Sequence, residues 1–101
     1  MRTATSVGIA LTAALLGVSP LAHADNDSFV RDLKNLGFVQ SSPNLISTAR
    51  SACYFLDRNR DPEQIRDRIS RYLAVDLSLA NTFFAMSVHE YCPWYGSRID
   101  G

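Results

Sequence analysis

Apolar residues recur at intervals of three and four positions along much of the chain, which is the spacing of one face of an α-helix. The pattern predicts four amphipathic helices joined by short polar connectors. The predicted buried positions, helix by helix, are Phe29, Leu33, Leu36; Leu45, Ile46, Ala49, Ala52, Cys53, Leu56; Ile65, Ile69, Leu73; and Ala80, Phe83, Phe84, Val88, Tyr91. No segment alternates between apolar and polar residues for long enough to predict a strand.

Residues that commonly begin or end helices flank these segments. The predicted starting signals are Asp25 and Asp27, Ser42-Pro43 with Ser42 as the cap, Asp61-Pro62, and Asp76. Gly37 follows the first helix, where glycine readily takes the left-handed conformation, and Pro93 stops the fourth. The fold class is therefore predicted to be all-α, a small bundle of about four short helices. Residues 94–101 show little periodicity, and we expect an irregular C-terminal tail there.

The first 24 residues have the order of a secretory signal peptide. Arg2 gives a positive end, residues 7–18 are uncharged and apolar, and Ala22-His23-Ala24 supplies small residues before the cleavage point. We expect cleavage between Ala24 and Asp25, and a secreted, periplasmic or cell-envelope protein. This apolar stretch is shorter than the about 20 residues that cross a bilayer. No later stretch is long and apolar enough either, so we expect no membrane span after cleavage. Residues 25–93 would then form the folded domain.

Cys53 and Cys92 are the only cysteines in the chain. Because export places them where thiols oxidise, we predict a disulfide that joins the second helix to the end of the fourth. His89 is the one histidine after the cleavage point, and with the cysteines it falls short of the four ligands that structural zinc prefers. Neighbouring side chains also provide no oriented nucleophile system for His89. We therefore expect no metal, no cofactor, no catalytic residue and no enzymatic activity.

The connector at residues 57–61 has the alternating oxygen side chains of a calcium loop, but the match ends there. Pro62 stands where such a loop needs glycine, and Arg68 stands where it needs a bidentate glutamate. We interpret the segment as a connector that ends in a helix cap. The arginines around it are Arg58, Arg60, Arg66, Arg68 and Arg71, interleaved with acidic residues. Mixed charges of this kind are typical of a solvated face, with a partner-binding surface as the alternative.

Overall charge excludes one class of partner. The chain has 10 Lys and Arg against 10 Asp and Glu, so it generates no field that would gather nucleic acid.

Two candidate binding sites are left. Tyr91, Trp94 and Tyr95 lie beside a predicted disulfide and form a possible interaction patch, since Trp and Tyr are favoured at interfaces. As an alternative, His89, Tyr54 and Met86 could line an interhelical pocket for haem or a small apolar ligand.

Several of these features together resemble a known family. They are the export signal, Asp27-x-Phe29 opening a helix that closes at Leu36-Gly37, the mid-chain Cys53, and the final Tyr91-Cys92-Pro93. This combination resembles the domain of unknown function 732, a family of small secreted mycobacterial proteins, from Asp25 to about Pro93. Members often carry a glycine near the first cysteine, and residues 51–55 contain none.

The resemblance implies a helical, disulfide-linked, exported domain in a cell-envelope setting. It implies no activity, and so it assigns no catalytic residues to this chain. We therefore expect a non-catalytic binding or interaction module at the cell envelope, with an unknown protein as its partner. Carriage of haem or a small apolar ligand is the alternative function.

Overall fold

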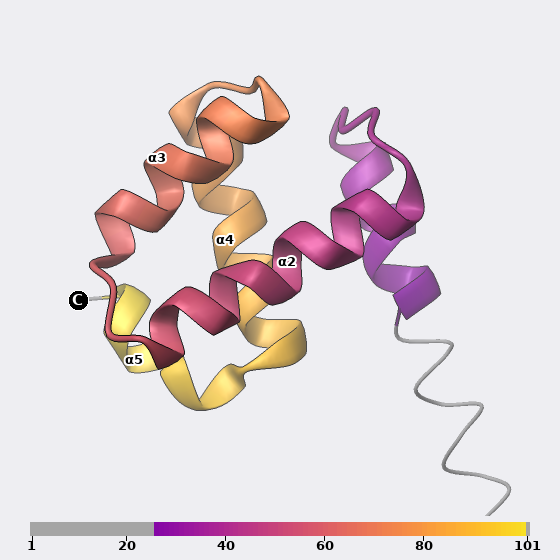
Figure 1. Ribbon diagram of the computed structural model, residues 1–101. Helices are drawn as coiled ribbons and strands as arrows, with labels where there is room; N and C mark the ends of the chain where they lie inside the picture. The colour runs from indigo at the N-terminus through magenta and orange to yellow at the C-terminus, as the bar shows by residue number, and fades with distance from the viewer. Residues whose placement is uncertain (1–25, 101) are drawn as a thin grey trace, which may run out of the picture.

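The computed structural model describes residues 26–100, and these are helical throughout apart from short connectors (Figure 1). The elements are a helix over residues 26–35, α2 (Ser42–Asp57), α3 (Pro62–Leu73), α4 (Leu77–Tyr91), the 3-10 helix η1 (Pro93–Tyr95) and α5 (Gly96–Asp100). No strand occurs within residues 26–100, and the prediction of an all-α fold is confirmed. The expected signal peptide and its cleavage point lie outside the described residues.

Side-chain caps start the three long helices. The Asp61 carboxylate accepts from the Glu63 N–H at 3.1 Å, and the Asp76 carboxylate accepts from the Leu79 N–H at 2.8 Å, as predicted. The cap of α2 is Ser41, whose hydroxyl accepts from the Asn44 N–H at 3.4 Å, so the prediction of Ser42 as the cap is wrong. Ser42 and Pro43 instead form the first two helical positions, where a missing proline N–H costs no helical hydrogen bond.

The helix over residues 26–35, α2 and α3 are each followed by a residue in the left-handed conformation. These residues are Gly37 (φ 110°), Asn59 (φ 62°) and Ala74 (φ 57°). In each case the next N–H turns back to a carbonyl five residues earlier, at 3.0–3.2 Å. This is the pattern of the Schellman motif, which satisfies carbonyls at the end of a helix. Gly37 was predicted for this role from the sequence.

The prediction that Leu36 is buried is wrong. Leu36 is 45% exposed, and Phe38 is buried in its place. The helix ends before Leu36, and the turn at Gly37 brings Phe38 back over Leu33, the apolar contact that accompanies a Schellman motif. Phe38 then packs against Phe83 with 5.4 Å between ring centres.

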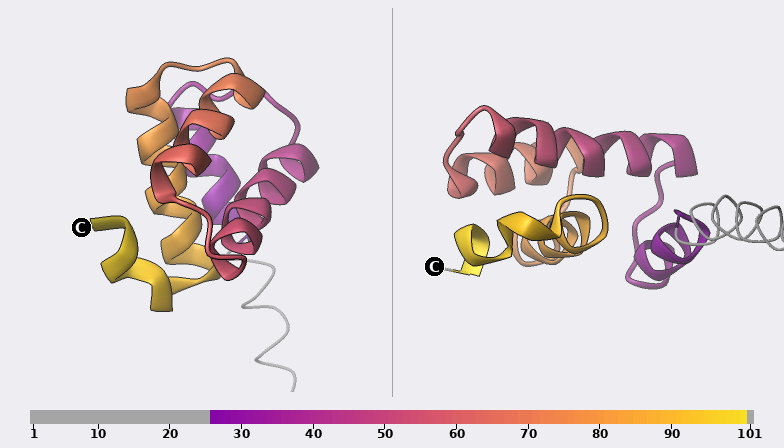
Figure 2. Two further views of the ribbon diagram at one scale, coloured as in Figure 1. Left: turned by 60° about the vertical axis from the view of Figure 1, so that its left-hand side comes forward. Right: turned by 90° about the horizontal axis from the view of Figure 1, so that it is seen from below.

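Helix α4 is the centre of the bundle. It packs against both α2 and α3, which contact each other much less (Figures 1 and 2). Its fully buried side chains include Phe83, Phe84 and Val88. The other predicted core positions on α2 and α3 are buried, apart from Ile46, which is partly buried against the core. Within residues 26–100, no helix has both the length and the apolar character needed to cross a membrane.

A disulfide joins Cys53 of α2 to Cys92 at the end of α4, as predicted, with 6.0 Å between the Cα atoms. Cys92 is almost fully buried and Cys53 is 9% exposed. The bond encloses α3, and it holds the C-terminal half of α2 against the end of α4.

The segment after Pro93 is not the irregular tail that we expected. It forms η1 and α5, and it packs back on the bundle (Figure 1). The Arg98 guanidinium donates to the carbonyls of Leu56 and Arg60 at 3.1 and 3.2 Å, and Arg66 donates to the Ile99 carbonyl at 2.9 Å. Arg98 therefore bonds the C-terminal segment to Leu56 in the last turn of α2 and to Arg60 in the connector after it. These contacts order residues whose sequence carries no helical periodicity.

Candidate functional site

Tyr91 is partly buried and packs against the core of the bundle. Its hydroxyl donates to Asn26 Oδ1 at 2.6 Å, and its ring packs edge-on against Phe29 with 5.4 Å between centres. The Arg50 guanidinium lies 5.3 Å from the centre of the Tyr91 ring. Burial raises the pKa of Tyr91 above the usual 10.0, and the positive charge of Arg50 partly opposes that rise.

Trp94 is the exposed member of the predicted interaction patch, at 70%. Tyr95 is partly buried, and its hydroxyl donates to the Asp57 carboxylate, a hydrogen bond that raises the pKa of Tyr95. The Trp94 and Tyr95 rings lie 6.0 Å apart. The structure therefore divides the predicted patch, because Tyr91 and Tyr95 hold the ends of the bundle together while Trp94 faces solvent.

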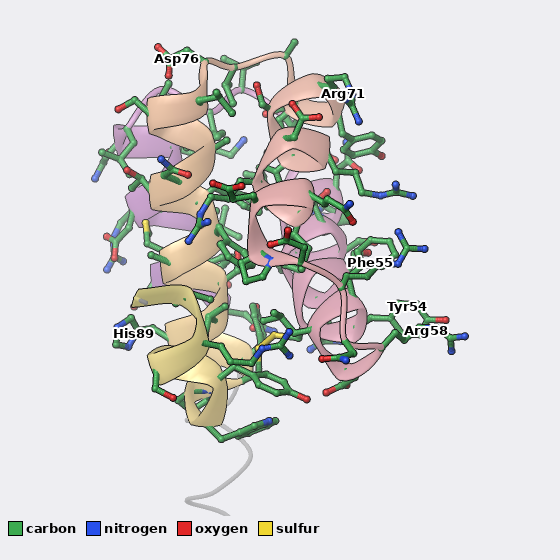
Figure 3. The ribbon with its side chains drawn as sticks, turned by 90° about the vertical axis from the view of Figure 1, so that its left-hand side faces the viewer. Tyr54, Phe55, Arg58, Arg71, Asp76 and His89 are labelled. Atoms are coloured by element: carbon green, nitrogen blue, oxygen red, sulfur yellow. A yellow bond between two sulfur atoms is a disulfide. The ribbon has the colours of Figure 1, made fainter. Side chains whose placement is uncertain are left out.

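The three residues of the predicted ligand pocket are not brought together. His89 projects from one edge of the molecule, and Tyr54 projects from the opposite edge (Figure 3). Met86 is partly buried against the core of the bundle. The geometry offers no shared pocket in which His89 could act as an axial ligand beside Tyr54.

The titratable side chains between α2 and α3 have structural roles. Asp57 accepts from Tyr95, and Asp61 caps α3, so residues 57–61 serve as the connector that we interpreted them to be. Across residues 26–100, no group of three or more His, Cys, Asp or Glu side chains could hold a metal ion.

A groove that is open to solvent and has a volume of about 330 Å³ lies between α2 and α3. We call it the α2–α3 groove. It is lined by Ser47, Thr48, Ser51, Ala52 and Phe55 of α2 and by Ile65, Arg68, Ile69 and Tyr72 of α3. The groove exists because α4 separates the two helices that form its walls. The apolar residues of its lining include Ala52, Ile65 and Ile69, which are almost fully buried.

The two walls of the groove differ in chemistry. Small hydroxyl residues, Ser47 and Ser51, line the α2 side, and both are exposed. The α3 side carries the larger Arg68 and Tyr72, of which Tyr72 is 64% exposed. The Tyr72 hydroxyl donates to Asn44 Oδ1 at 3.2 Å, which links the two walls at one end.

Arginines surround the other end of the groove, beside Phe55. The guanidinium carbons of Arg68 and Arg60 lie 4.6 and 5.6 Å from the centre of the Phe55 ring. Arg58 stands over the ring of Tyr54 at 5.4 Å, and Tyr54 packs edge-on against Phe55 (Figure 3). Cation–π contacts of this kind are attractive when the cation lies within about 6 Å of the ring centre.

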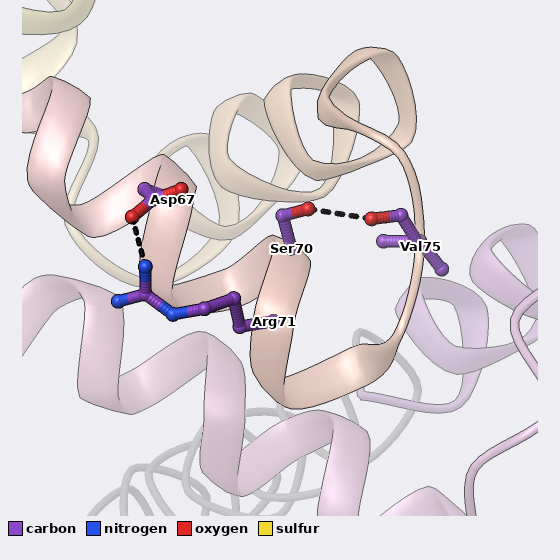
Figure 4. Close-up of polar contacts among 4 residues, drawn as sticks. All are labelled: Asp67, Ser70, Arg71 and Val75. Atoms are coloured by element: carbon purple, nitrogen blue, oxygen red, sulfur yellow. Dashed lines mark hydrogen bonds and ion pairs between the residues drawn. The ribbon is translucent and has the colours of Figure 1, made fainter.

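A polar depression continues from this end of the groove. It shares Phe55, Ile65 and Arg68 with the groove and adds Arg60, Gln64, Asp67 and Arg71. Asp67 forms an ion pair with Arg71, four residues later on α3 (Figure 4). The extended surface thus holds three arginines and one aspartate, and the aspartate is already paired.

The groove was not among the site predictions. The arginine cluster was noted from the sequence, but mixed charge predicted a solvated face. The positions of two aromatic residues are a better indication of the groove. Phe55 and Tyr72 lie beside the apolar stripes of their helices, outside the positions that pack against α4.

A family model described as "Protein of unknown function (DUF732)" matches residues 24–94. The chain belongs to the DUF732 family. The predicted resemblance is thereby confirmed. No curated protein and no solved structure gives a significant match.

The DUF732 match contains both cysteines and every residue of the α2–α3 groove. It ends within η1, so α5 and its Arg98 contacts lie beyond the matched segment. The groove of this chain therefore lies entirely within the matched segment.

Proposed function

We propose that this DUF732 protein is a non-catalytic binding module that acts after export, at the cell envelope or outside the cell. The α2–α3 groove is the observation that carries the proposal. It is a concave surface with an apolar floor and with Tyr and Arg on its rim, the residue types most often found at the energetic centre of interfaces.

The framework of the groove suits recognition by a preformed surface. Its two walls belong to helices that α4 supports from behind, and the Cys53–Cys92 bond ties α2 to the end of α4. A surface held in this way loses little conformational freedom on binding. The disulfide also supports an extracytoplasmic setting, because such bonds persist where the environment is oxidising.

The exposed Trp94 is a second surface that could contact a partner in the same role. It directly follows Pro93 and the buried Cys92, so its position is fixed by the end of α4. The groove and Trp94 can be distinguished by substitution, because Tyr72 and Trp94 are both largely exposed and neither change removes a buried side chain.

Affinity capture tests the proposal. The mature wild-type protein, Tyr72→Ala and Trp94→Ala would be immobilised and exposed to envelope extract, and retained proteins would be quantified by mass spectrometry. We expect a specific partner whose recovery falls about tenfold with Tyr72→Ala, the loss typical of an interface centre. Recovery that falls only with Trp94→Ala would place the contact on Trp94. Absence of any specific partner would contradict the proposal.

A further inference from the structure

The α2–α3 groove also indicates the chemical class of its ligand. We propose that it binds an acidic segment of a partner protein, which inserts one apolar side chain into the groove and places carboxylates against Arg60 and Arg68. This inference rests on the proposed binding function. It adds the nature of the partner.

The apolar half of the ligand follows from the floor of the groove. Ala52, Ile65 and Ile69 are almost fully buried from solvent and form its base, and the Phe55 ring closes one end. A volume of about 330 Å³ lies at the lower limit of ligand cavities. The groove therefore accepts a large side chain, such as leucine or phenylalanine, and not a large cofactor.

The acidic half of the ligand follows from the arginines. The guanidinium carbons of Arg60 and Arg68 lie 5.6 and 4.6 Å from the centre of the Phe55 ring, close enough for the ring to attract both groups and hold them beside the groove before a ligand arrives. Each guanidinium carries five N–H donors in a rigid planar fork. A carboxylate can accept from two such groups at once, which makes it the best-matched ligand.

In the part of the chain that the structure describes, no carboxylate of the chain forms an ion pair with Arg60 or Arg68. Asp57 accepts from Tyr95, Asp61 accepts from the N–H of Glu63, and Asp67 pairs with Arg71. An approaching acidic segment would meet arginine donors around Phe55. The charges on this surface are therefore complementary to an acidic ligand.

The same observations favour a protein segment over a membrane or a nucleic acid. Positive and negative residues balance over the chain, at 10 each, so there is no extended field of the kind that gathers a polyanion. The apolar surface is concave, which suits a single protruding side chain better than a flat bilayer. The hydroxyls of Ser47 and Ser51 line one wall and can bond to a peptide backbone.

Binding to designed peptides tests the ligand class. The probe is a fluorescent, helix-forming peptide with leucines on one face and glutamates elsewhere. Two control peptides carry lysine in place of the glutamates, or serine in place of the leucines. By fluorescence anisotropy we expect the leucine–glutamate peptide to bind at least about tenfold more tightly than either control peptide. Its affinity should fall as salt is added, because the ion pairs lie at the rim of the groove.

Two pairs of variants locate the site. Arg68→Gln should weaken binding about fivefold or more, whereas Arg31→Gln, an exposed arginine of the helix over residues 26–35, should leave it unchanged. Ser51→Trp should fill the groove and abolish binding, whereas Ser78→Trp at the exposed start of α4 should not. Circular dichroism melts of all four variants establish that they are folded.

Each other outcome overturns the inference in a recognisable way. Equal binding of the lysine and glutamate peptides, still lost in Ser51→Trp, would remove the acidic partner but keep the groove as a binding site. Binding unaffected by Ser51→Trp would remove the groove from both proposals. Failure of all peptides combined with binding to phosphatidylglycerol vesicles would favour a membrane. A dimer of the protein alone that Ser51→Trp dissociates would make a second copy the occupant.

Discussion

Three helices are followed by a residue in the left-handed conformation, and the three residue types adopt it at different steric cost. They are Gly37, Asn59 and Ala74. Each takes a positive φ so that the chain can turn back on the helix. Glycine takes this conformation at little steric cost, and asparagine adopts it more readily than other residues. Ala74 has neither advantage. Its position is stabilised by the hydrogen bond from the Val75 N–H to the Ser70 carbonyl at 3.1 Å and by the Ser70 hydroxyl, which donates to the Val75 carbonyl at 2.6 Å (Figure 4).

Ala74→Gly should therefore stabilise the protein. Relief of the left-handed strain outweighs the extra freedom of glycine in the unfolded chain, for a net gain of about 0.5–1 kcal/mol. Urea denaturation measures the free energy of unfolding. Ala85→Gly, within α4, is the matched control and should destabilise by about 1 kcal/mol. A loss of stability in Ala74→Gly would show that the alanine side chain contributes more than its backbone costs.

Ionisation of Tyr91 should lower the free energy of unfolding at alkaline pH. Burial raises its pKa in the folded state, so the folded protein retains the phenolic proton after the unfolded chain has lost it. The stabilisation is complete below the unfolded pKa of about 10 and is lost as pH rises through the higher folded value. Unfolding free energies at about pH 8 and about pH 11 should differ less in Tyr91→Phe than in wild type.

Asn26→Ala separates the two roles of the Tyr91 hydroxyl. This change removes the acceptor of its hydrogen bond and keeps the titrating phenol. It should lower stability by about 1 kcal/mol at pH values where the phenol still carries its proton, while leaving the part of the alkaline loss that comes from burial in place. A pH profile of Tyr91→Phe identical to wild type would assign the alkaline loss to other groups.

At the scale of the element, α5 depends on tertiary contacts for its existence. It has five residues, far fewer than an isolated helix needs in water. Its order comes from Arg98, which bonds to the Leu56 carbonyl of α2 and to the Arg60 carbonyl of the next connector, and from the bond between Arg66 and the Ile99 carbonyl. The C-terminal segment and the end of α2 therefore order each other.

Arg98→Gln should loosen both partners at once. The loss of two charge-assisted hydrogen bonds should cost about 1–3 kcal/mol. Hydrogen exchange should become faster in η1 and α5 and in the connector after α2, while the amides of α4 keep their protection. Ser97→Ala, a change at the exposed neighbouring position, should have no such effect. Exchange that rises evenly over the whole bundle would contradict this local coupling.

The three long helices could be predicted from the sequence and α5 could not, because they depend on different kinds of contact. The long helices follow from local signals, since apolar stripes such as Ile65, Ile69 and Leu73 and caps such as Asp76 lie within a few residues of one another. The helix of α5 follows from partners about forty positions away, which periodicity does not reveal. The α2–α3 groove is of the second kind, because it depends on how far apart α4 holds its walls.

At the scale of the whole molecule, the disulfide is the strongest single constraint. It connects residues 39 positions apart and closes a loop that contains all of α3 and α4. In the chain-entropy model such a loop contributes about 4 kcal/mol to the free energy of unfolding. This is comparable to what a hydrophobic core of this size provides by itself.

Cys53→Ser combined with Cys92→Ser should lower the free energy of unfolding by about 4 kcal/mol, and reduction of the wild type should have a similar effect. Chemical denaturation with and without reductant measures both. The double variant should be insensitive to reductant, which controls for effects of the reagent. A wild type that keeps its full stability in reductant would show that the folded core suffices.

The central position of α4 has a consequence for how the surface can change over evolutionary time. Residues that hold the bundle together, such as Phe83 and Phe84, point into the interior, while Tyr72 and Ser51 on the groove walls are mostly in solvent. Substitutions on the walls therefore carry little penalty for folding. We expect related chains to share the interior and to differ on these two outer faces, so that one scaffold serves many partners.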